Sequence, residues 1–261
     1  MDMSRSKDYF EEYLKEYPDA PSLVLVRSVE LKNFPYRYLE PPILDLCCGD
    51  GFFAEQLGLS DIYGCDIDEK SIAIAKIRKV YKEVCKCDAR SLEAYPDNFF
   101  NTIISNCALE HIDGIELALK SSYRVLNKKG KLIMTVPSPN LNRWFPGSKE
   151  KLVKFNARQR HLNIYSIDEW CNLLNRIGFQ IVEYYYIFDE KSYKVALFLD
   201  ALPEMLSKFY VIYRYALKLT PKSIKRFLFR VLLKKYYIQS QPIIDNGGEL
   251  VIIAQKNEEK F

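Results

Sequence analysis

The stretch Ile43-Leu44-Asp45-Leu46-Cys47-Cys48-Gly49-Asp50-Gly51-Phe52-Phe53 decides the fold of this chain. An apolar strand contains a carboxylate near its end, two glycines follow, and the next residues can begin a helix. Such a strand, glycine turn and helix form the site where nucleotide-type cofactors bind, at the carboxyl edge of a parallel sheet. A third glycine is expected in this turn, and Cys47 stands in its place.

Strand and helix patterns alternate from residue 43 onward. Strands are predicted at 43–46, 61–67, 84–87, 101–105, 131–136 and 180–187, and helices at 52–57, 68–81, 113–126 and 166–177. The last two helices begin with pairs that resemble capping boxes, Asp113 with Glu116 and Ser166 with Glu169. The alternation predicts an α/β fold, a doubly wound, Rossmann-like parallel sheet with helices on both faces. A last strand at 249–254 has no helix directly before it, so it can enter antiparallel.

The patterns divide the chain into four parts. Residues 1–42 form a helical N-terminal segment, residues 43–187 the Rossmann-like core, residues 188–246 a basic, aromatic-rich helical insertion, and residues 247–261 the final strand and tail. Within the core, roughly two dozen residues after position 136 are predicted to be a loop. A loop of this length in a compact domain is usually functional or mobile.

Composition limits the class of protein. The 261 residues are 48% hydrophobic, enough for one large domain or a domain with an appendage. Seven cysteines without a CxxC pair predict reduced thiols in the cytoplasm. The first residues, 1–7, lack the apolar core of a signal peptide, and no apolar run approaches the ~20 residues of a membrane span. No cluster has metal-ligand spacing, so no metal is predicted.

The acidic residues narrow the choice of cofactor. Residues 49–54 match the dinucleotide pattern GxGxxG/A, which alone is weak. Asp45 beside the turn would oppose a phosphate at the helix N-terminus. Acids also follow the next two strands, where Asp66 can accept hydrogen bonds from both ribose hydroxyls and Asp88 from an adenine amino group. Three acids along one sheet edge suit a cationic ligand that carries adenosine.

These motifs together resemble the class I S-adenosylmethionine-dependent methyltransferases, close to the branch that acts on small molecules. The matching segments occur in family order and spacing within 43–187, and they are Leu44-Asp45-Leu46-Cys47-Cys48-Gly49-Asp50-Gly51, Gly64-Cys65-Asp66-Ile67-Asp68, Cys87-Asp88-Ala89, Ser105-Asn106-Cys107-Ala108-Leu109-Glu110-His111-Ile112, Arg124-Val125-Leu126-Asn127-Lys128-Lys129-Gly130 and Arg160-His161-Leu162-Asn163-Ile164-Tyr165-Ser166. The combination is specific, although no single segment is.

The resemblance implies a seven-stranded sheet with an antiparallel last strand. It also implies S-adenosyl-L-methionine as the cofactor and S-adenosyl-L-homocysteine as its product. The residues it places at the cofactor are Asp45, Cys47, Gly49 and Gly51 at the methionine part, Asp66 at the ribose, Ile67, Asp88 and Ala89 at the adenine, and Asn106 near the reactive end. Cys47 departs from the family's usual glycine, and its side chain can crowd the methionine chain.

The acceptor side holds the only two histidines of the chain. His111 and His161 both lie in matched segments, and histidine suits proton abstraction near neutral pH. The other interpretation is that each histidine only orders its loop. Methyltransferases that act on nucleic-acid amines carry an Asn/Asp-Pro-Pro-aromatic motif, whereas this chain reads Asn106-Cys107-Ala108-Leu109. We therefore expect a small-molecule or glycan/lipid-linked acceptor rather than a nucleic-acid acceptor.

Basic character is concentrated at 205–239, which contains no Asp or Glu. Its nine basic residues are Lys208, Arg214, Lys218, Lys222, Lys225, Arg226, Arg230, Lys234 and Lys235. Aromatic and aliphatic residues alternate with them, and an apolar face is expected over 224–232. A helical lid, a homodimer surface, a peripheral membrane contact and an RNA contact all remain open for this segment.

Two other functions stay open at this point. One is an NAD-linked Rossmann oxidoreductase, which the glycine pattern allows. The other is a non-catalytic binding or scaffold protein that retains the methyltransferase fold, for which Cys47 is the warning sign. Binding of S-adenosylhomocysteine, of NAD or of neither distinguishes the three.

Overall fold

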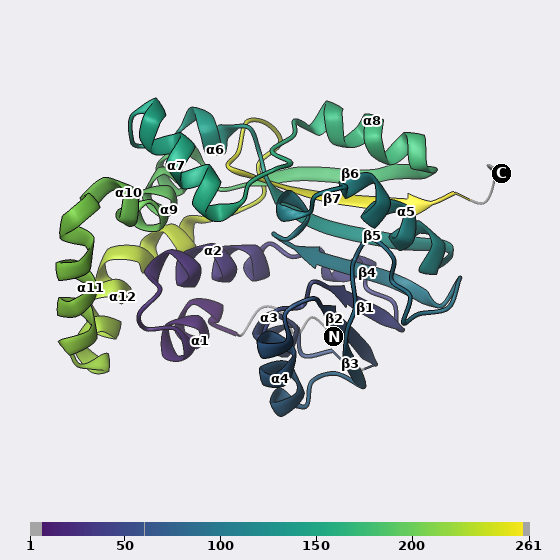
Figure 1. The fold of residues 1–261 in the computed structure, drawn as a ribbon, viewed down its shortest axis with the longest axis horizontal. Coiled ribbons are helices and arrows are strands. Elements are labelled where there is room, and N and C mark those ends of the chain that lie inside the picture. The colour runs from purple at the N-terminus through teal and green to yellow at the C-terminus, as the bar shows by residue number, and fades with distance from the viewer. Residues whose placement is uncertain (1–6, 60, 258–261) are drawn as a thin grey trace. The chain divides into compact units, whose positions relative to one another are not determined.

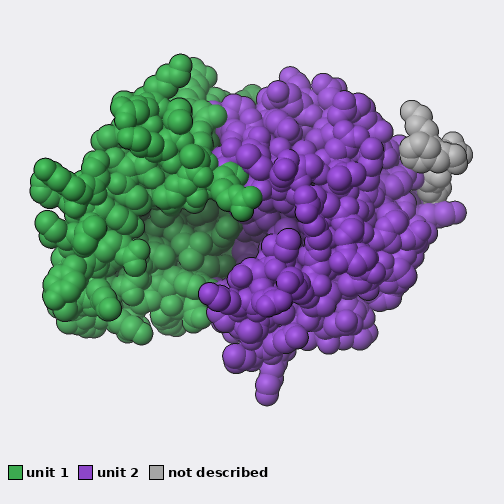
Figure 2. All heavy atoms as spheres, in the orientation of Figure 1, with its two compact units in different colours: residues 1–34, 140–160, 186–248 green, residues 35–139, 161–185, 249–261 purple. Residues whose placement is uncertain are grey.

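The structure, a computed structural model, describes residues 7–59 and 61–257. The predicted absence of a signal peptide concerns residues 1–7, of which 1–6 lie outside the described part. The chain forms two compact units, coloured separately in Figure 2. Unit 1 comprises Met1–Phe34, Asn140–Arg160 and Tyr186–Gly248, and unit 2 comprises Pro35–Pro139, His161–Tyr185 and Glu249–Phe261.

A seven-stranded sheet forms the centre of unit 2 (Figure 1). Its strands are β1 (Ile43–Leu46), β2 (Ile62–Asp66), β3 (Glu83–Lys86), β4 (Phe100–Asn106), β5 (Leu126–Pro137), β6 (Phe179–Ile187) and β7 (Glu249–Lys256). The strand order is β3-β2-β1-β4-β5-β7-β6. The neighbours from β3 to β5 pair in parallel, whereas β7 runs antiparallel to β5. The predicted fold class and its antiparallel last strand are confirmed.

Apolar residues in the inner strands make the core. All four residues of β1 are buried, because a parallel strand in the middle of such a sheet is covered on both faces. Thr102 on β4 is also buried, and its hydroxyl donates to the Glu40 carbonyl and accepts from the Glu40 N–H. These bonds join the segment before β1 to the sheet, so the first strand has a fixed position.

The helices of unit 2 alternate with its strands. They are α3 (Phe52–Leu57), α4 (Glu69–Arg78), α5 (Ile115–Val125) and α8 (Ile167–Ile177), with short 3₁₀ turns η2 (Tyr36–Tyr38) and η3 (Leu109–His111). From β1 the chain moves outward through β2 and β3 in one direction and through β4 and β5 in the other. Right-handed crossovers therefore place α3 and α4 on one face and α5 on the opposite face.

Helix ends confirm one predicted capping box and correct the other. Ser166 and Glu169 form the capping box of α8, and Gly178 ends that helix in the left-handed conformation. The box predicted for Asp113 and Glu116 was wrong. Gly114 occupies the cap of α5 at φ 76°, without a side-chain cap bond, and the Glu116 carboxylate pairs with Lys120 instead.

Unit 1 is built from helices. They are α1 (Tyr9–Glu16), α2 (Pro21–Lys32), α6 (Asn140–Arg143), α7 (Lys149–Gln159), α9 (Glu190–Asp200), α10 (Leu202–Leu206), α11 (Tyr210–Leu219) and α12 (Lys222–Gln239), with the 3₁₀ turn η4 (Ser207–Phe209). The prediction of a long loop after position 136 was wrong, because α6 and α7 occupy it. The Ser148 hydroxyl accepts from the Lys151 N–H and begins α7 directly after Pro146 and Gly147.

Residues from distant parts of the sequence join α12 to the N-terminal helices of unit 1. Helix α12 packs on α1 and α2, and Glu11 on α1 binds both Arg230 and Lys234 on α12. The Arg230 hydrogen bonds lower the pKa of Glu11 to about 2. Within the described part of the chain, no helix combines the length and apolar character needed to cross a membrane.

Candidate active site

The acids predicted from strand ends come together at the carboxyl edge of the sheet in unit 2. Asp45 is the third residue of β1, and Asp66 and Asn106 end β2 and β4. Asp45 is paired with Gly64 on β2, so the neighbouring strands end at similar heights. Asp66 accepts a hydrogen bond from the Gly49 N–H, which places it beside the turn after β1, and Asp88 follows β3, the strand paired with β2.

The turn between β1 and α3 holds its residues in left-handed backbone conformations. Gly49 and Gly51 have φ values of 55° and 79°. At Gly51 a Cβ would lie 2.9 Å from the ring of Tyr81, whereas a Cβ at Gly49 would meet no atom within 4 Å. Gly51 is therefore required because the Tyr81 ring packs against it. The space beside Gly49 is open, as a loop that lies against a ligand requires.

Cys47 adopts the same left-handed conformation, at φ 60°. This backbone geometry costs an L-residue with a side chain roughly 1–2 kcal/mol, which explains why a glycine is expected here. Burial, followed by repulsion from Asp66 and Asp45, raises the pKa of the Cys47 thiol to about 12. The thiol stays protonated near neutral pH, which argues against a nucleophilic role for Cys47.

Asp66 is held rigidly at the end of β2. Its Oδ2 accepts from the Gly49 N–H at 2.9 Å, and its Oδ1 accepts from the Asp68 N–H at 2.9 Å. A carboxylate oxygen can accept two hydrogen bonds, so each oxygen retains capacity for a ligand hydroxyl. The following residue, Ile67, has 63% of its surface exposed. An oriented carboxylate beside an exposed aliphatic side chain suits a ribose with an attached base.

Asp45 is buried, and its carboxyl group has a raised pKa. Only 3% of its surface is exposed, and its Oδ2 accepts from the Tyr81 hydroxyl at 2.7 Å. Burial raises the pKa of Asp45 to about 7, repulsion from Asp66 adds to the rise, and the Tyr81 bond opposes it. A carboxyl with a raised pKa binds a cation strongly, because the cation relieves the cost of its buried charge.

Tyr81 contacts the candidate site although the sequence did not indicate it, because its hydroxyl donates to Asp45. The predicted helix 68–81 ends earlier, at Arg78, because Lys79 turns the backbone into the left-handed conformation. The chain then returns beneath the glycine turn, and the Tyr81 ring packs in a cluster with Cys48, Ile72, Ala75 and Val84. The one signal in the sequence is the pair of glycines, 51 and 64, that leaves room for this ring.

Asp88 follows β3 and has a partner of its own. The Arg90 guanidinium donates to Asp88 Oδ2 at 2.6 Å and, through Nε, to both carboxylate oxygens at 3.1 Å. These bonds lower the pKa of Asp88. Its neighbour Ala89 is buried. Arg90 was not singled out from the sequence, because only the turn after β3 brings it back onto Asp88.

The two histidines come together although 50 residues separate them. The rings of His111 and His161 stack with centroids 5.3 Å apart and an angle of 15° between their planes. His111 Nε2 lies 3.5 Å from Oε1 of Glu110, whose side chain is 2% exposed. The prediction gave these histidines a shared location on the acceptor side but did not anticipate the stack or the acid beside it.

Backbone and amide bonds fix the histidine pair. The N–H groups of Leu162 and Asn163 both donate to the Glu110 carbonyl, at 2.8 and 3.1 Å. The Asn163 side-chain amide donates to the carbonyls of Leu109 and Ile112, at 2.8 Å each. Segment 161–163 is thus bound to η3, and the two imidazoles keep their relative orientation.

Comparison with known proteins assigns this arrangement to a family. The family described as "Methyltransferase domain" matches residues 16–184, well over half of the chain. The chain therefore belongs to the methyltransferase-domain family, and the family implies S-adenosylmethionine as its cofactor.

Individual relatives are similar to parts of the chain. Phosphoethanolamine N-methyltransferase 1 of Zea mays is 25% identical over 64% of this chain and 32% of its own length. A malonyl-[acyl-carrier protein] O-methyltransferase of Bacillus cytotoxicus is 30% identical over 42% of this chain and 41% of its own. The chain thus spans less than half the length of these two relatives.

A solved structure confirms the fold. An S-adenosylmethionine-dependent methyltransferase of Thermotoga maritima, described as a possible histamine N-methyltransferase, superposes with a TM-score of 0.60. The superposition covers 95% of this chain and 99% of that one, with 21% sequence identity. Likeness at this level of identity concerns the arrangement of strands and helices.

The residues at this sheet edge fit the cofactor of the family. The space beside Gly49 is open, the Asp66 carboxylate retains acceptor capacity, and the buried Asp45 carboxyl favours a cation. Asn106 ends β4, on the strand next to β1. The individual contacts of these residues with the cofactor stay predictions.

Replacing Cys47 with glycine is expected to give a more stable protein than replacing it with alanine. Glycine removes the left-handed strain of roughly 1–2 kcal/mol, which offsets its extra chain entropy of about 0.5–1 kcal/mol. Alanine keeps the strain, and both variants lose the sulfur contacts. Urea unfolding of the two variants measures the difference. If Cys47→Ala is the more stable one, the left-handed backbone is not strained.

Proposed function

We propose that this protein is an S-adenosylmethionine-dependent methyltransferase that acts on a small-molecule or glycan/lipid-linked acceptor. The observation that carries the proposal is Asp66, held by the N–H groups of Gly49 and Asp68 beside an open turn. The two N–H groups orient the Asp66 carboxylate before a ligand binds, so binding requires little reorganisation of this side chain. Asp45 below the turn adds a buried carboxyl for a cationic group.

S-adenosylmethionine, when bound, supplies a methyl group that its sulfonium has already activated. The residues of this chain then have three tasks. Asp66 with Ile67 would bind the adenosine, and Asp45 with the turn at Gly49 would bind the methionine part. Asn106 and the histidine pair would align the acceptor. Alignment provides most of the acceleration in such a displacement.

We assign proton transfer to the histidine pair. An imidazole suits this task near neutral pH, and a base contributes about 10²–10⁴-fold when the acceptor must lose a proton. Because Nε2 of His111 lies 3.5 Å from the Glu110 carboxylate, the ring would accept the proton at Nδ1, and Glu110 would stabilise the resulting imidazolium. The stacked ring of His161 keeps the His111 ring from turning.

The two alternative functions find less support. A dinucleotide pyrophosphate would meet the buried Asp45 carboxyl next to the helix that should bind it. A non-catalytic scaffold would not need Asp66 in its bonded orientation. Isothermal titration calorimetry with S-adenosylhomocysteine and with NAD distinguishes the functions. We expect binding of the first only, and binding of neither would favour the scaffold.

Replacing Asp66 with alanine is expected to weaken S-adenosylhomocysteine binding by about 10²–10³-fold. The change removes two charge-assisted bonds to a ligand, each of about 1.5–3 kcal/mol, and part of this loss is offset by water. Calorimetry measures the affinity, and Asp50→Ala in the same turn is the control. Equal losses in both variants would mean that Asp66 only supports the loop.

The class of acceptor can be tested without knowing its identity. Transfer of a labelled methyl group from S-adenosylmethionine into a chloroform/methanol extract of cells separates lipid-linked from water-soluble acceptors. Label in either phase supports the proposed activity. The four-part division of the chain at 1–42, 43–187, 188–246 and 247–261 stays a prediction, as does the cytoplasmic location.

A further inference from the structure

Unit 1 exposes apolar side chains on its last two helices. Of the 21 large hydrophobic residues of the described chain that are exposed, 11 lie between Phe209 and Ile238. We define the docking face by these residues, which are Phe209, Val211, Ile212, Tyr215, Leu219, Ile224, Phe227, Leu228, Val231, Leu232 and Ile238. Apolar surface gathered on consecutive helices marks an interaction site.

The spacing of these residues forms helical stripes. On α11 they recur at positions 211, 215 and 219, and on α12 at positions 224, 227, 228, 231, 232 and 238. Residues three and four apart share one face of a helix, so each helix presents a continuous apolar stripe to solvent. Most helices of a soluble domain bury such a stripe in the core.

Ion pairs to α1 and to the segment before α2 hold α12 in this orientation. Lys225 is only 4% exposed, and its ammonium binds the Asp19 carboxylate just before α2. Arg230 and Lys234 bind Glu11 on α1, so three charged groups of α12 face the unit. Lys225, Arg230 and Lys234 thus face the unit, whereas six apolar residues of α12 are exposed to solvent.

The remaining cations stay available around the docking face. Six of the nine basic residues between 205 and 239 have no acidic partner within the described part of the chain, and they are Lys208, Arg214, Lys218, Lys222, Arg226 and Lys235. No Asp or Glu occurs in this segment. The face therefore combines apolar side chains with a positive charge that no acid of its own helices neutralises.

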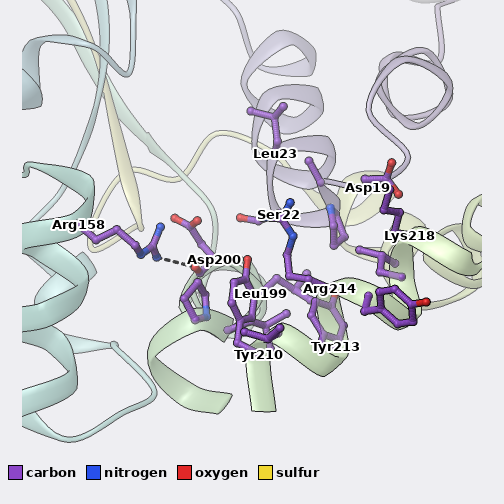
Figure 3. A pocket seen from close by; sticks show the side chains of 17 residues that line it. Asp19, Ser22, Leu23, Arg158, Leu199, Asp200, Tyr210, Tyr213, Arg214 and Lys218 are labelled. Atoms are coloured by element: carbon purple, nitrogen blue, oxygen red, sulfur yellow. Dashed lines mark hydrogen bonds between the residues drawn. The ribbon is translucent and has the colours of Figure 1, made fainter. Parts of the chain in front are cut away.

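A cavity of about 760 Å³ opens beside α11 in unit 1 (Figure 3). The start of α2, the end of α9 and α11 line it, and the lining includes Arg214, Lys218 and the docking-face residues Val211 and Tyr215. Its two acids already have partners, since Asp19 binds Lys225 and Asp200 accepts from Gln159 at 2.6 Å. Arg214 and Lys218 have no acidic partner among the described residues, so the wall of the cavity keeps two positive charges beside the Asp200 carboxyl, whose partner Gln159 is neutral.

We propose that the docking face binds the surface of an anionic lipid bilayer. Apolar side chains would enter the boundary between head groups and acyl chains, while Lys and Arg attract the anionic lipids. A second copy of this chain is disfavoured as the occupant, because two such faces would bring like charges together. RNA is disfavoured because it would leave aliphatic residues such as Val231 and Leu232 in water. The proposal concerns a surface of unit 1 and does not depend on methyl transfer.

Co-sedimentation with vesicles tests the proposal. The full chain is expected to bind vesicles of phosphatidylcholine mixed with phosphatidylglycerol and not those of phosphatidylcholine alone. Binding should fall as salt rises, because salt screens the attraction between exposed charges. Val231→Glu should lower binding about tenfold or more, since it removes apolar contact and adds repulsion.

Matched variants separate the docking face from general effects. Val153 on α7 is 61% exposed against 63% for Val231, so Val153→Glu is the control for the apolar change. For charge, Lys222→Glu with Arg226→Glu should weaken binding about tenfold or more, whereas Lys149→Glu with Lys191→Glu should not. Thermal melts verify that all variants fold.

The results have definite readings. Binding to the anionic vesicles that falls in the docking-face variants and not in the controls supports the proposal. No binding to these vesicles, or equal loss in Val153→Glu and Val231→Glu, overturns it. Two other results without vesicle binding would also overturn the proposal. One is a dimer, seen by sedimentation velocity, that Val231→Glu dissociates. The other is preferential binding of single-stranded RNA.

Discussion

Replacing His111 with alanine is expected to lower methyl transfer by about 10²–10⁴-fold while S-adenosylhomocysteine binding stays unchanged. The change removes the imidazole that lies 3.5 Å from Glu110 and stacks on His161. His161→Ala should have a smaller effect, because it removes only the ring that stacks on His111 and leaves the proton acceptor, His111, in place. Transfer of label into the acceptor phase of the cell extract measures the rate, and calorimetry measures cofactor binding.

The dependence of rate on pH distinguishes proton transfer from loop order. A base that must be unprotonated gives the parent protein a rate that falls toward acidic pH, and this limb should disappear in His111→Ala. Asn163→Ala is the control, because it releases the loop that holds His161 but keeps both imidazoles. If the two variants lose the same rate and keep the same pH profile, the histidines only order their loops.

The sequence predicted elements whose signals are local. Strand β1 and helix α3 begin and end at the predicted residues, because an apolar run and a glycine turn define them without distant partners. The acids at 45 and 66 could be placed at one edge for a similar reason, since parallel strands in sequence order end on the same side.

What the sequence did not predict depends on distant contacts. Tyr81 reaches Asp45 only because α4 stops at Arg78, and no pattern around Tyr81 indicates that turn. The stack of His111 on His161 requires the amide bonds of Asn163 to η3. The apolar stripe on α12 was also not predictable from its pattern alone. Such a pattern usually indicates a buried helix face, whereas here the ion pairs of Lys225 and Arg230 hold the helix with this stripe exposed.

Replacing Asp45 with asparagine is expected to stabilise the protein at pH 8 and to have little effect at pH 4. Burial raises the pKa of Asp45 from 3.8 to about 7. Its contribution to stability is therefore fully present below pH 3.8 and is lost as pH rises toward 7, up to about 4 kcal/mol. The asparagine side chain cannot ionise. The free energy of unfolding of the variant therefore does not fall between pH 4 and pH 7 as that of the parent does.

Urea unfolding between pH 4 and pH 8 measures the difference. Asp68→Asn is the control, because Asp68 is exposed and hydrogen bonds to Ser71 lower its pKa. The stability contributed by Asp68 is lost only as pH falls below the ordinary aspartate pKa of 3.8. The free energy of unfolding of Asp68→Asn should therefore differ from that of the parent by a constant amount between pH 5 and pH 8. If the Asp45→Asn difference is also constant there, Asp45 is not buried with a raised pKa.

The same carboxyl should make cofactor binding depend on pH. A cationic group beside Asp45 favours the ionised form, so S-adenosylhomocysteine should bind the parent protein with release of a proton below about pH 7. Its affinity would fall by up to tenfold for each pH unit below that value. Calorimetry in buffers of different ionisation enthalpy measures the released proton directly. Asp45→Asn should show neither the release nor the dependence, and proton release that persists in this variant would assign the linkage to another group.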